Sequence, residues 1–95
     1  MSKKIFKYPL DIEDVQDVFL PVNSTILSIH KMGKGSTERL CLYAIVDDEE
    51  KNEEKVTIEI FGTWTLTGAG VSRKFFGTVI LQDGAFVAHV FQRLN

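Results

Sequence analysis

Short segments of β-branched and aromatic residues, separated by glycine, aspartate and asparagine, recur along the chain and limit what it can fold into. The clearest segment is Lys55–Ile60, in which Val56, Ile58 and Ile60 alternate with Lys55, Thr57 and Glu59. Side chains alternate between the two faces of a strand, so the apolar residues should be buried and the polar residues should be exposed to solvent.

A second segment, Leu40–Val46, is apolar at almost every position. Continuous apolar character is typical of a central strand covered on both faces, rather than an edge strand. Together the segments predict an all-β fold, a small antiparallel sandwich or partly open barrel of about six or seven strands.

Turn residues predict three hairpins. Asp83-Gly84 suits a tight type I′ turn between strands over Val79–Gln82 and Ala85–Phe91, because both residues tolerate positive φ angles. The glycines of Gly33–Ser36 should join a strand over Thr25–Lys31 to the one that starts at Leu40. The acidic stretch 47–54 is expected to form the third hairpin, leading into a strand over 55–61.

The N-terminal region has two interpretations. Ile5–Leu10 is expected to be extended, followed by a short turn over Asp11–Val15 and a strand at Val18–Leu20. A helix over Asp11–Phe19 is the alternative, since Asp11 could cap it and Ile12, Val15 and Phe19 share helical spacing.

A chain of 95 residues with 44% hydrophobic content predicts one domain over residues 1–95 with a single modest core. A sizeable pocket is therefore expected on the surface or between subunits. Apolar runs stay well short of the roughly 18 residues that span a bilayer, and the N-terminus lacks a signal-peptide h-region. We expect an intracellular protein that does not associate with membranes.

The net charge of −2 conceals a segregation of charge. Six acids and one base lie between Asp47 and Glu54, which leaves ten bases against seven acids in the rest of the chain. This mildly basic remainder could attract a small anion. It lacks the dense basic stripe of a duplex-binding protein, so general nucleic-acid binding is not expected.

Metal and catalytic motifs are missing from the sequence. The single cysteine, Cys41, lies in an apolar run and should pack in the core, which leaves no disulfide and no cysteine zinc site. The acidic stretch does not follow the spacing of an EF-hand. His30 and His89 lack the His-x-Ser/Thr pairing of two-histidine phosphoesterases, and His89 is expected to be packed or to line a pocket. We predict no enzyme activity, no catalytic residue, no metal and no cofactor.

The segment Phe61–Thr78 is the candidate binding site. The triplet Phe-Gly-Thr brackets it, and it contains the only tryptophan, two flexible glycines and two adjacent cations. Backbone amides and cations can hold a phosphate while an aromatic ring stacks on a planar group. The candidate ligand-binding residues are Thr63, Trp64, Thr67, Ser72, Arg73, Lys74 and His89.

Other uses of this segment stay open. It could be an ordinary connection between strands, and the two triplets could be two similar strand ends. Trp64, Phe75 and Phe76 could anchor an oligomer interface or belong to the core. Phe76 is the one expected to be buried, because it alternates with Ile80.

Several separated motifs resemble a family of small, largely uncharacterised proteins encoded by bacteriophages. They are the N-terminal Lys-Ile-Phe-Lys-Tyr-Pro-Leu (4–10), Leu-Tyr-Ala-Ile-Val-Asp (42–47), the Gly-Thr corner at 62–63, Phe-Gly-Thr (76–78) and the C-terminal Phe-Val-Ala-His-Val-Phe (86–91). The resemblance covers most of the chain. Members of the family typically have a shorter connection after the Gly-Thr corner, so the Trp64–Lys74 insertion departs from their pattern.

The resemblance implies a phage accessory protein that acts by binding in the cytoplasm of the infected bacterium. The leading hypothesis is counter-defence by sequestering a nucleotide immune signal, a small anionic ligand, in a homo-oligomer. The alternative is a protein-interaction domain that inhibits a host protein or serves as a virion accessory. An enzyme acting on nucleotides is the least favoured hypothesis.

Overall fold

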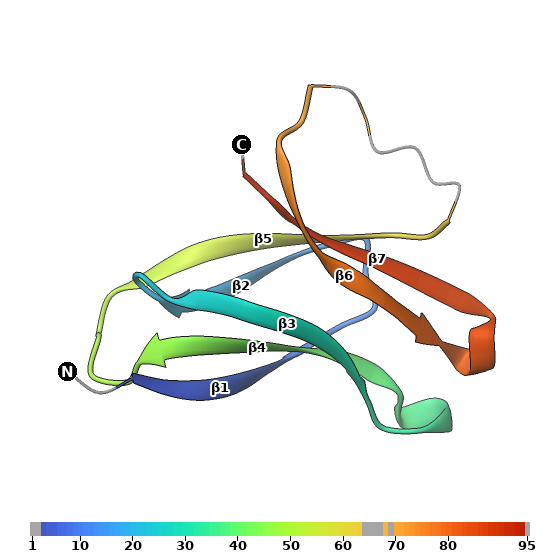
Figure 1. The fold of residues 1–95 in the computed structure, drawn as a ribbon, viewed down its shortest axis with the longest axis horizontal. Helices are drawn as coiled ribbons and strands as arrows, with labels where there is room; N and C mark the ends of the chain where they lie inside the picture. The colour runs from blue at the N-terminus through green and yellow to red at the C-terminus, as the bar shows by residue number, and fades with distance from the viewer. Residues whose placement is uncertain (1–2, 64–67, 69, 95) are drawn as a thin grey trace.

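The computed structural model describes residues 3–63, 68 and 70–94, which fold into seven β-strands (Figure 1). The strands are β1 (Lys3–Leu10), β2 (Val15–Pro21), β3 (Thr25–Met32), β4 (Arg39–Asp47), β5 (Glu53–Phe61), β6 (Arg73–Leu81) and β7 (Phe86–Arg93). Two 3-10 turns, η1 (Gly35–Thr37) and η2 (Gln82–Gly84), lie between strands. The predicted all-β fold is confirmed, and no helix in the described part of the chain is long and apolar enough to cross a membrane.

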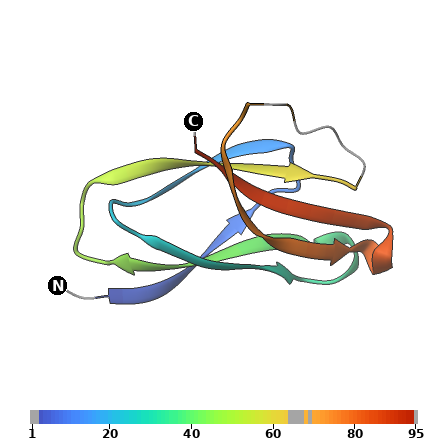
Figure 2. The same cartoon turned by 45° about the horizontal axis from the view of Figure 1, so that its top comes forward.

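The strands form two antiparallel sheets that face each other as a sandwich (Figure 2). One sheet has the order β1-β4-β3 and the other β2-β5-β7-β6. The side chains that face inward from β4 and β5 make much of the core: Leu40, Leu42, Ala44, Val46, Val56, Ile58 and Ile60. The sheets do not close into a barrel, so the sandwich is the correct one of the two predicted forms.

Strand β4 is central, as predicted, because β1 and β3 pair with its two edges. Its cover on the outer face is incomplete. Cys41 is buried there, whereas Tyr43 and Ile45 are only half-buried. Neighbouring side chains of the same sheet shield these residues in place of the second layer that the apolar run predicts.

Two predicted hairpins are confirmed. The turn after Gly33 joins β3 to β4, and the residues around Asp83 join β6 to β7. The second turn is longer than the two residues expected, because Leu81 and Phe86 are the last paired residues and the N–H of Ala85 bonds to the carbonyl of Gln82. Gln82 and Asp83 both have positive φ angles in this four-residue loop.

The third predicted hairpin is wrong. Strand β4 belongs to the three-stranded sheet and β5 to the four-stranded sheet, so the acidic stretch crosses between layers. The physical reason is that both edges of β4 are already occupied by β1 and β3. Strand β5 pairs instead with β2 and β7.

The alternative helix over Asp11–Phe19 is also wrong. Residues from Val15 onward pair with β5, starting at Val15 opposite Glu59. The predicted turn before them is present, and the side-chain amide of Gln16 closes it by bonding to both the N–H and the carbonyl of Asp11, at 3.0 and 2.6 Å.

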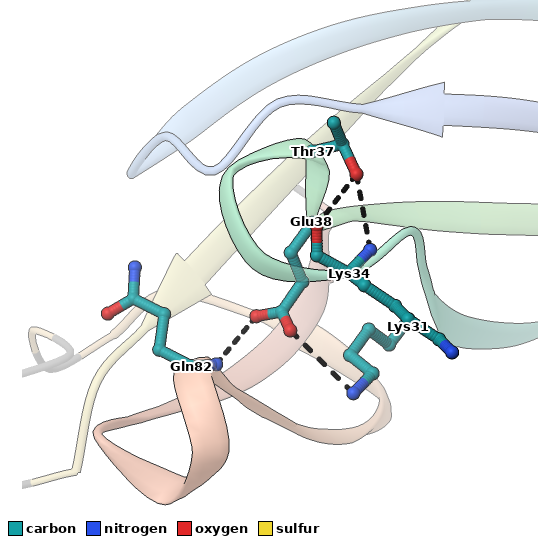
Figure 3. Close-up of polar contacts among 5 residues, drawn as sticks. All are labelled: Lys31, Lys34, Thr37, Glu38 and Gln82. Atoms are coloured by element: carbon teal, nitrogen blue, oxygen red, sulfur yellow. Dashed lines mark hydrogen bonds and ion pairs between the residues drawn. The ribbon is translucent and has the colours of Figure 1, made fainter.

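Glu38 ties the two sheets together at one end of the sandwich (Figure 3). Its carboxylate accepts a hydrogen bond from the backbone N–H of Gln82 and lies 3.6 Å from the ammonium of Lys31. Thr37 closes the adjacent turn, because its hydroxyl donates to the carbonyl of Lys34 and accepts from that residue's N–H. The β3–β4 and β6–β7 turns therefore hold each other in place.

Candidate binding surface

The face of the four-stranded sheet that points away from the core carries a row of three phenylalanines, which we call the outer aromatic row. It consists of Phe61 on β5, Phe91 on β7 and Phe75 on β6. The ring centroids of Phe61 and Phe91 are 5.7 Å apart in an edge arrangement, and those of Phe75 and Phe91 are 5.1 Å apart. Phe75 remains 56% exposed.

A β-bulge in β6 positions part of this face. The register with β7 shifts between Phe75 and Gly77, so one extra residue is inserted and the alternation of faces is reset. Phe76, which was expected to be buried, packs against the core but is only partly buried. Ile80 would face the same side as Phe76 in a regular strand, but it is exposed on the outer face instead.

An ion pair lies over the outer aromatic row. The Nε of Arg73 donates to Oε1 of Glu59 at 2.7 Å, and the guanidinium stacks 5.0 Å from the ring centre of Phe61. The side chain of Glu59 is only 7% exposed, which contradicts the prediction that this residue faces water. Its neighbours on adjacent strands cover it, and the guanidinium supplies the charge that makes its burial tolerable.

His89 links the two Phe-Gly-Thr triplets. Its Nε2 is 3.0 Å from the hydroxyl of Thr63 and its Nδ1 is 3.0 Å from that of Thr78. Thr63 follows the end of β5, whereas Thr78 lies within β6, so only the first triplet is a strand end. Both ring nitrogens of this half-buried histidine have partners, one as donor and one as acceptor in the neutral ring.

The other predicted ligand-binding residues are distributed differently. Lys74 lines a recess between the sheets, on the opposite side of β6 from Arg73, because adjacent residues of a strand face opposite ways. These two cations therefore do not converge. Ser72 is exposed, and its carbonyl accepts from the N–H of Leu94. Trp64 and Thr67 lie outside the described residues.

Several residues of this face are not among the predicted ligand-binding residues. They are Val15 and Phe19 on β2, Glu59 and Phe61 on β5, Ile80 on β6 and Phe91 on β7. Val15, Phe19 and Ile80 are exposed despite their apolar side chains. The available signal was the presence of aromatic or aliphatic residues at outward strand positions, where a half-solvated sheet usually has polar ones.

A family model described as a domain of unknown function, DUF7352, matches residues 1–95. The chain belongs to this family. No curated protein and no solved structure matches it. For this DUF7352 chain, a function has to be inferred from its own surface chemistry.

The polar side chains of this surface contact one another. The acidic and histidine side chains in the described ranges form no group of three that could hold a metal ion. The imidazole of His89 is engaged on both sides, and Arg73 is neutralised by Glu59. What the face offers a ligand is rigid aromatic and aliphatic area with polar groups at its border.

Proposed function

We propose that this protein is a non-enzymatic phage accessory protein that binds another protein through the outer face of the β2-β5-β7-β6 sheet, in the cytoplasm of the infected bacterium. The phage context comes from the resemblance of its N-terminal and C-terminal motifs to phage-encoded proteins. The outer aromatic row, with Arg73 fixed over it, is the observation that carries the proposal.

The composition of the face supports a protein partner. Buried centres of protein interfaces are enriched in aromatic residues and arginine and depleted in other charged residues. Phe75, Phe19 and Ile80 are each more than half exposed on this face. Because Phe91 already contacts Phe61 and Phe75, the rings lose little freedom when a partner covers them.

The partner is either another copy of the chain or a host or phage protein. A small domain gains apolar burial by associating with itself, which supports the predicted homo-oligomer. A host protein bound at the same face would be inhibited by having its own contact surface covered.

Nucleotide sequestration is the second candidate, supported by the cluster around His89. The imidazole and the hydroxyls of Thr63 and Thr78 are hydrogen-bonding groups on the same face as the phenylalanine rings. A stacked base with polar edges suits such a surface. The neutralisation of Arg73 by Glu59 weighs against a phosphate at that residue.

Native mass spectrometry of the wild type and of Phe75→Glu is the first test. A charged side chain at the centre of an apolar contact should weaken association at least tenfold. Ile5→Glu is the matched control, since Ile5 is also more than half exposed but lies on the other sheet. Circular dichroism of both variants confirms that they fold.

Loss of self-association, or of a stoichiometric complex with a phage or host protein, in Phe75→Glu but not in Ile5→Glu supports the proposal. Equal behaviour of both variants overturns it. Adding cyclic dinucleotides and ADP-ribose-type signals to the same samples tests the second candidate. Nucleotide held in a fixed ratio and lost in His89→Ala would favour it over a protein partner.

A further inference from the structure

The two sheets contact each other along one side of the sandwich and have free edges along the other. Strands β3 and β6, each the last strand of its sheet, lie side by side. Strands β1 and β2 are the opposite ends of the same two sheets, and each pairs with a single neighbour among the described strands. Both free edges therefore border the same side of the molecule. The two strands run in opposite directions and are joined by residues 11–14 (Figure 1).

Backbone hydrogen bonds show which residues of β2 face its free edge. The carbonyl of Asp14 accepts from the N–H of Ile60. At the other end, the N–H of Val22 donates to the carbonyl of Asn52. Because the backbone groups of successive residues alternate between the two edges of a strand, the even-numbered residues of β2 face β5. The N–H groups that face the free edge are those of residues 15, 17 and 19.

Pro9 gives the same information for β1. Proline has no N–H, and within a sheet it is found where its nitrogen faces away from the neighbouring strand. Pro9 lies opposite Cys41 of β4, so Pro9 and the other odd-numbered residues of β1 face the free edge. Pro21 has the equivalent place at the end of β2, where it is also odd-numbered.

The two edges carry charges of opposite sign. Strand β1 contains no acidic residue and three lysines, which are Lys3, Lys4 and Lys7. Strand β2 and the turn before it contain no basic residue and four acidic ones, which are Asp11, Glu13, Asp14 and Asp17. Lys7 takes part in none of the ion pairs of the described residues. Opposite charges on two free edges favour pairing of one edge with the other.

Both edge strands also leave apolar side chains exposed. Phe6 shares the inner face with its register partner Ala44, yet it is 41% exposed. Val15 and Phe19 of β2 are 52% and 55% exposed. Between Val15 and Leu20, β2 has no lysine, proline or bulge, the features that usually keep an edge strand from pairing. Strands β3 and β6 each contain a bulge.

We infer that two copies of the chain form a two-fold dimer in which β1 of each copy pairs antiparallel with β2 of the other. Pairing residues 3–9 with residues 15–21 matches the edge-facing residues along the full length of both strands. Lys7 of one copy then lies opposite Asp17 of the other on the outer face. Registers shifted by two residues overlap less and separate these two charges.

The symmetry closes the assembly. When β2 of one copy receives β1 of the second, the two-fold axis places β1 of the first copy beside β2 of the second. Both free edges of each copy on this side are then used. The four-stranded sheet of one copy and the three-stranded sheet of the other join in the order β6-β7-β5-β2-β1-β4-β3. No edge on this side remains to extend the dimer into a fibre.

Sedimentation equilibrium of the purified full chain measures the dimer, and charge reversal tests its register. Lys7→Asp and Asp17→Lys should each raise the dissociation constant about tenfold or more, because like charges then lie opposite each other at two symmetric contacts. The double variant Lys7→Asp, Asp17→Lys places opposite charges together again and should recover the dissociation constant to within about threefold. Lys34→Asp is the matched control, since this exposed lysine lies outside both edge strands. Circular dichroism shows that each variant is folded.

Hydrogen exchange identifies the strand that pairs. The N–H groups of Val15, Asp17 and Phe19 should exchange about tenfold more slowly, or slower still, at concentrations above the dissociation constant than far below it. Those of Gln16 and Val18, which face β5, should be protected at both concentrations. This alternation separates edge pairing from association through a face of the sheet.

A folded wild-type chain that stays monomeric up to about 1 mM overturns the inference. A dimer that both charge reversals leave unchanged overturns it as well, as does exchange at Asp17 that is independent of concentration. Growth of long polymers in place of a dimer contradicts the two-fold closure and overturns it too.

The inference does not depend on the proposed function, because the paired edges and the outer aromatic row lie on different strands. Phe75→Glu should leave this dimer intact. Ile5→Glu loses one apolar contact with Phe19 but keeps the backbone bonds of β1. Its carboxylate lies between Lys3 and Lys7, so the dissociation constant should change by less than about threefold. The edge dimer is therefore present in both variants, and a loss of association specific to Phe75→Glu reports the outer face.

Discussion

The carboxylate of Glu38 accepts a hydrogen bond from the backbone N–H of Gln82, 2.6 Å away and 44 positions later in the chain. Glu38 precedes β4 in one sheet, and Gln82 follows β6 in the other. The contact joins the turns of two hairpins that share no strand pairing (Figure 3).

Glu38→Ala should lower the free energy of unfolding by about 1–3 kcal/mol, because the N–H of Gln82 loses its acceptor. Glu38→Gln retains an acceptor and should cost less. Lys31→Met removes only a 3.6 Å ion pair that is exposed on the lysine side, and should cost less than about 1 kcal/mol. Urea unfolding measures all three. A loss from Lys31→Met equal to that from Glu38→Ala would show that the ion pair, and not the hydrogen bond, joins the turns.

Gly33 is predicted to be intolerant of a side chain. It has a φ of +80°, and a Cβ at this position would lie 2.3 Å from the carbonyl oxygen of Thr37. Gly35→Ala is the matched control, since Gly35 has a φ of +56° and open space around it. The control should lose only the cost of the left-handed conformation, about 1–2 kcal/mol. Thermal unfolding should show a larger loss for Gly33→Ala, and equal losses would contradict the steric argument.

The Glu59–Arg73 pair should be strongly coupled. Arg73→Met leaves a buried carboxylate without its cation and should destabilise the fold by about 3 kcal/mol. The double variant Glu59→Leu, Arg73→Met removes both charges and should recover much of that loss. A double-mutant cycle by chemical denaturation measures the coupling. Additive effects of the two single changes would show that the pair contributes no specific interaction.

Tyr8 makes stability depend on alkaline pH. Burial, and then the negative charge of Glu53, raise the pKa of the Tyr8 hydroxyl above its ordinary value. Because the pKa is raised in the folded state, the protonated Tyr8 hydroxyl contributes to the stability of the fold. This contribution is complete below the ordinary tyrosine pKa of about 10 and is lost as the pH rises through the pKa of Tyr8 in the folded protein. Stability should therefore fall above about pH 10. Tyr8→Phe should flatten this dependence in urea unfolding followed across pH.

The phenolate absorbance of a Tyr43→Phe variant reports Tyr8 directly, because the chain has two tyrosines. Its titration midpoint should lie above that of free tyrosine. A midpoint at or below the free value would contradict the effect of burial and of Glu53.

The local features of the fold could be predicted from the sequence. The alternation of Val56, Ile58 and Ile60 with polar residues predicts a strand, because every second side chain of a strand faces the core. This pattern can be recognised from a short stretch of sequence alone. The glycines before β4 and the Asp83-Gly84 pair mark turns for a similar reason, since the φ angles that they favour are local properties. The all-β class and two hairpins follow from such signals.

Only the tertiary structure decided which strands share a sheet and which distant side chains meet. The acidic stretch gives no sign that β5 joins the other sheet, because that depends on β1 and β3 occupying both edges of β4. The pairing of Glu59 with Arg73, the contacts of His89 with both threonines and the orientation of Lys74 into the recess depend on register and on one bulge in β6. A shift of one residue sends every later side chain of a strand to the other face, so these relationships are set by strand pairing and cannot be derived from local periodicity.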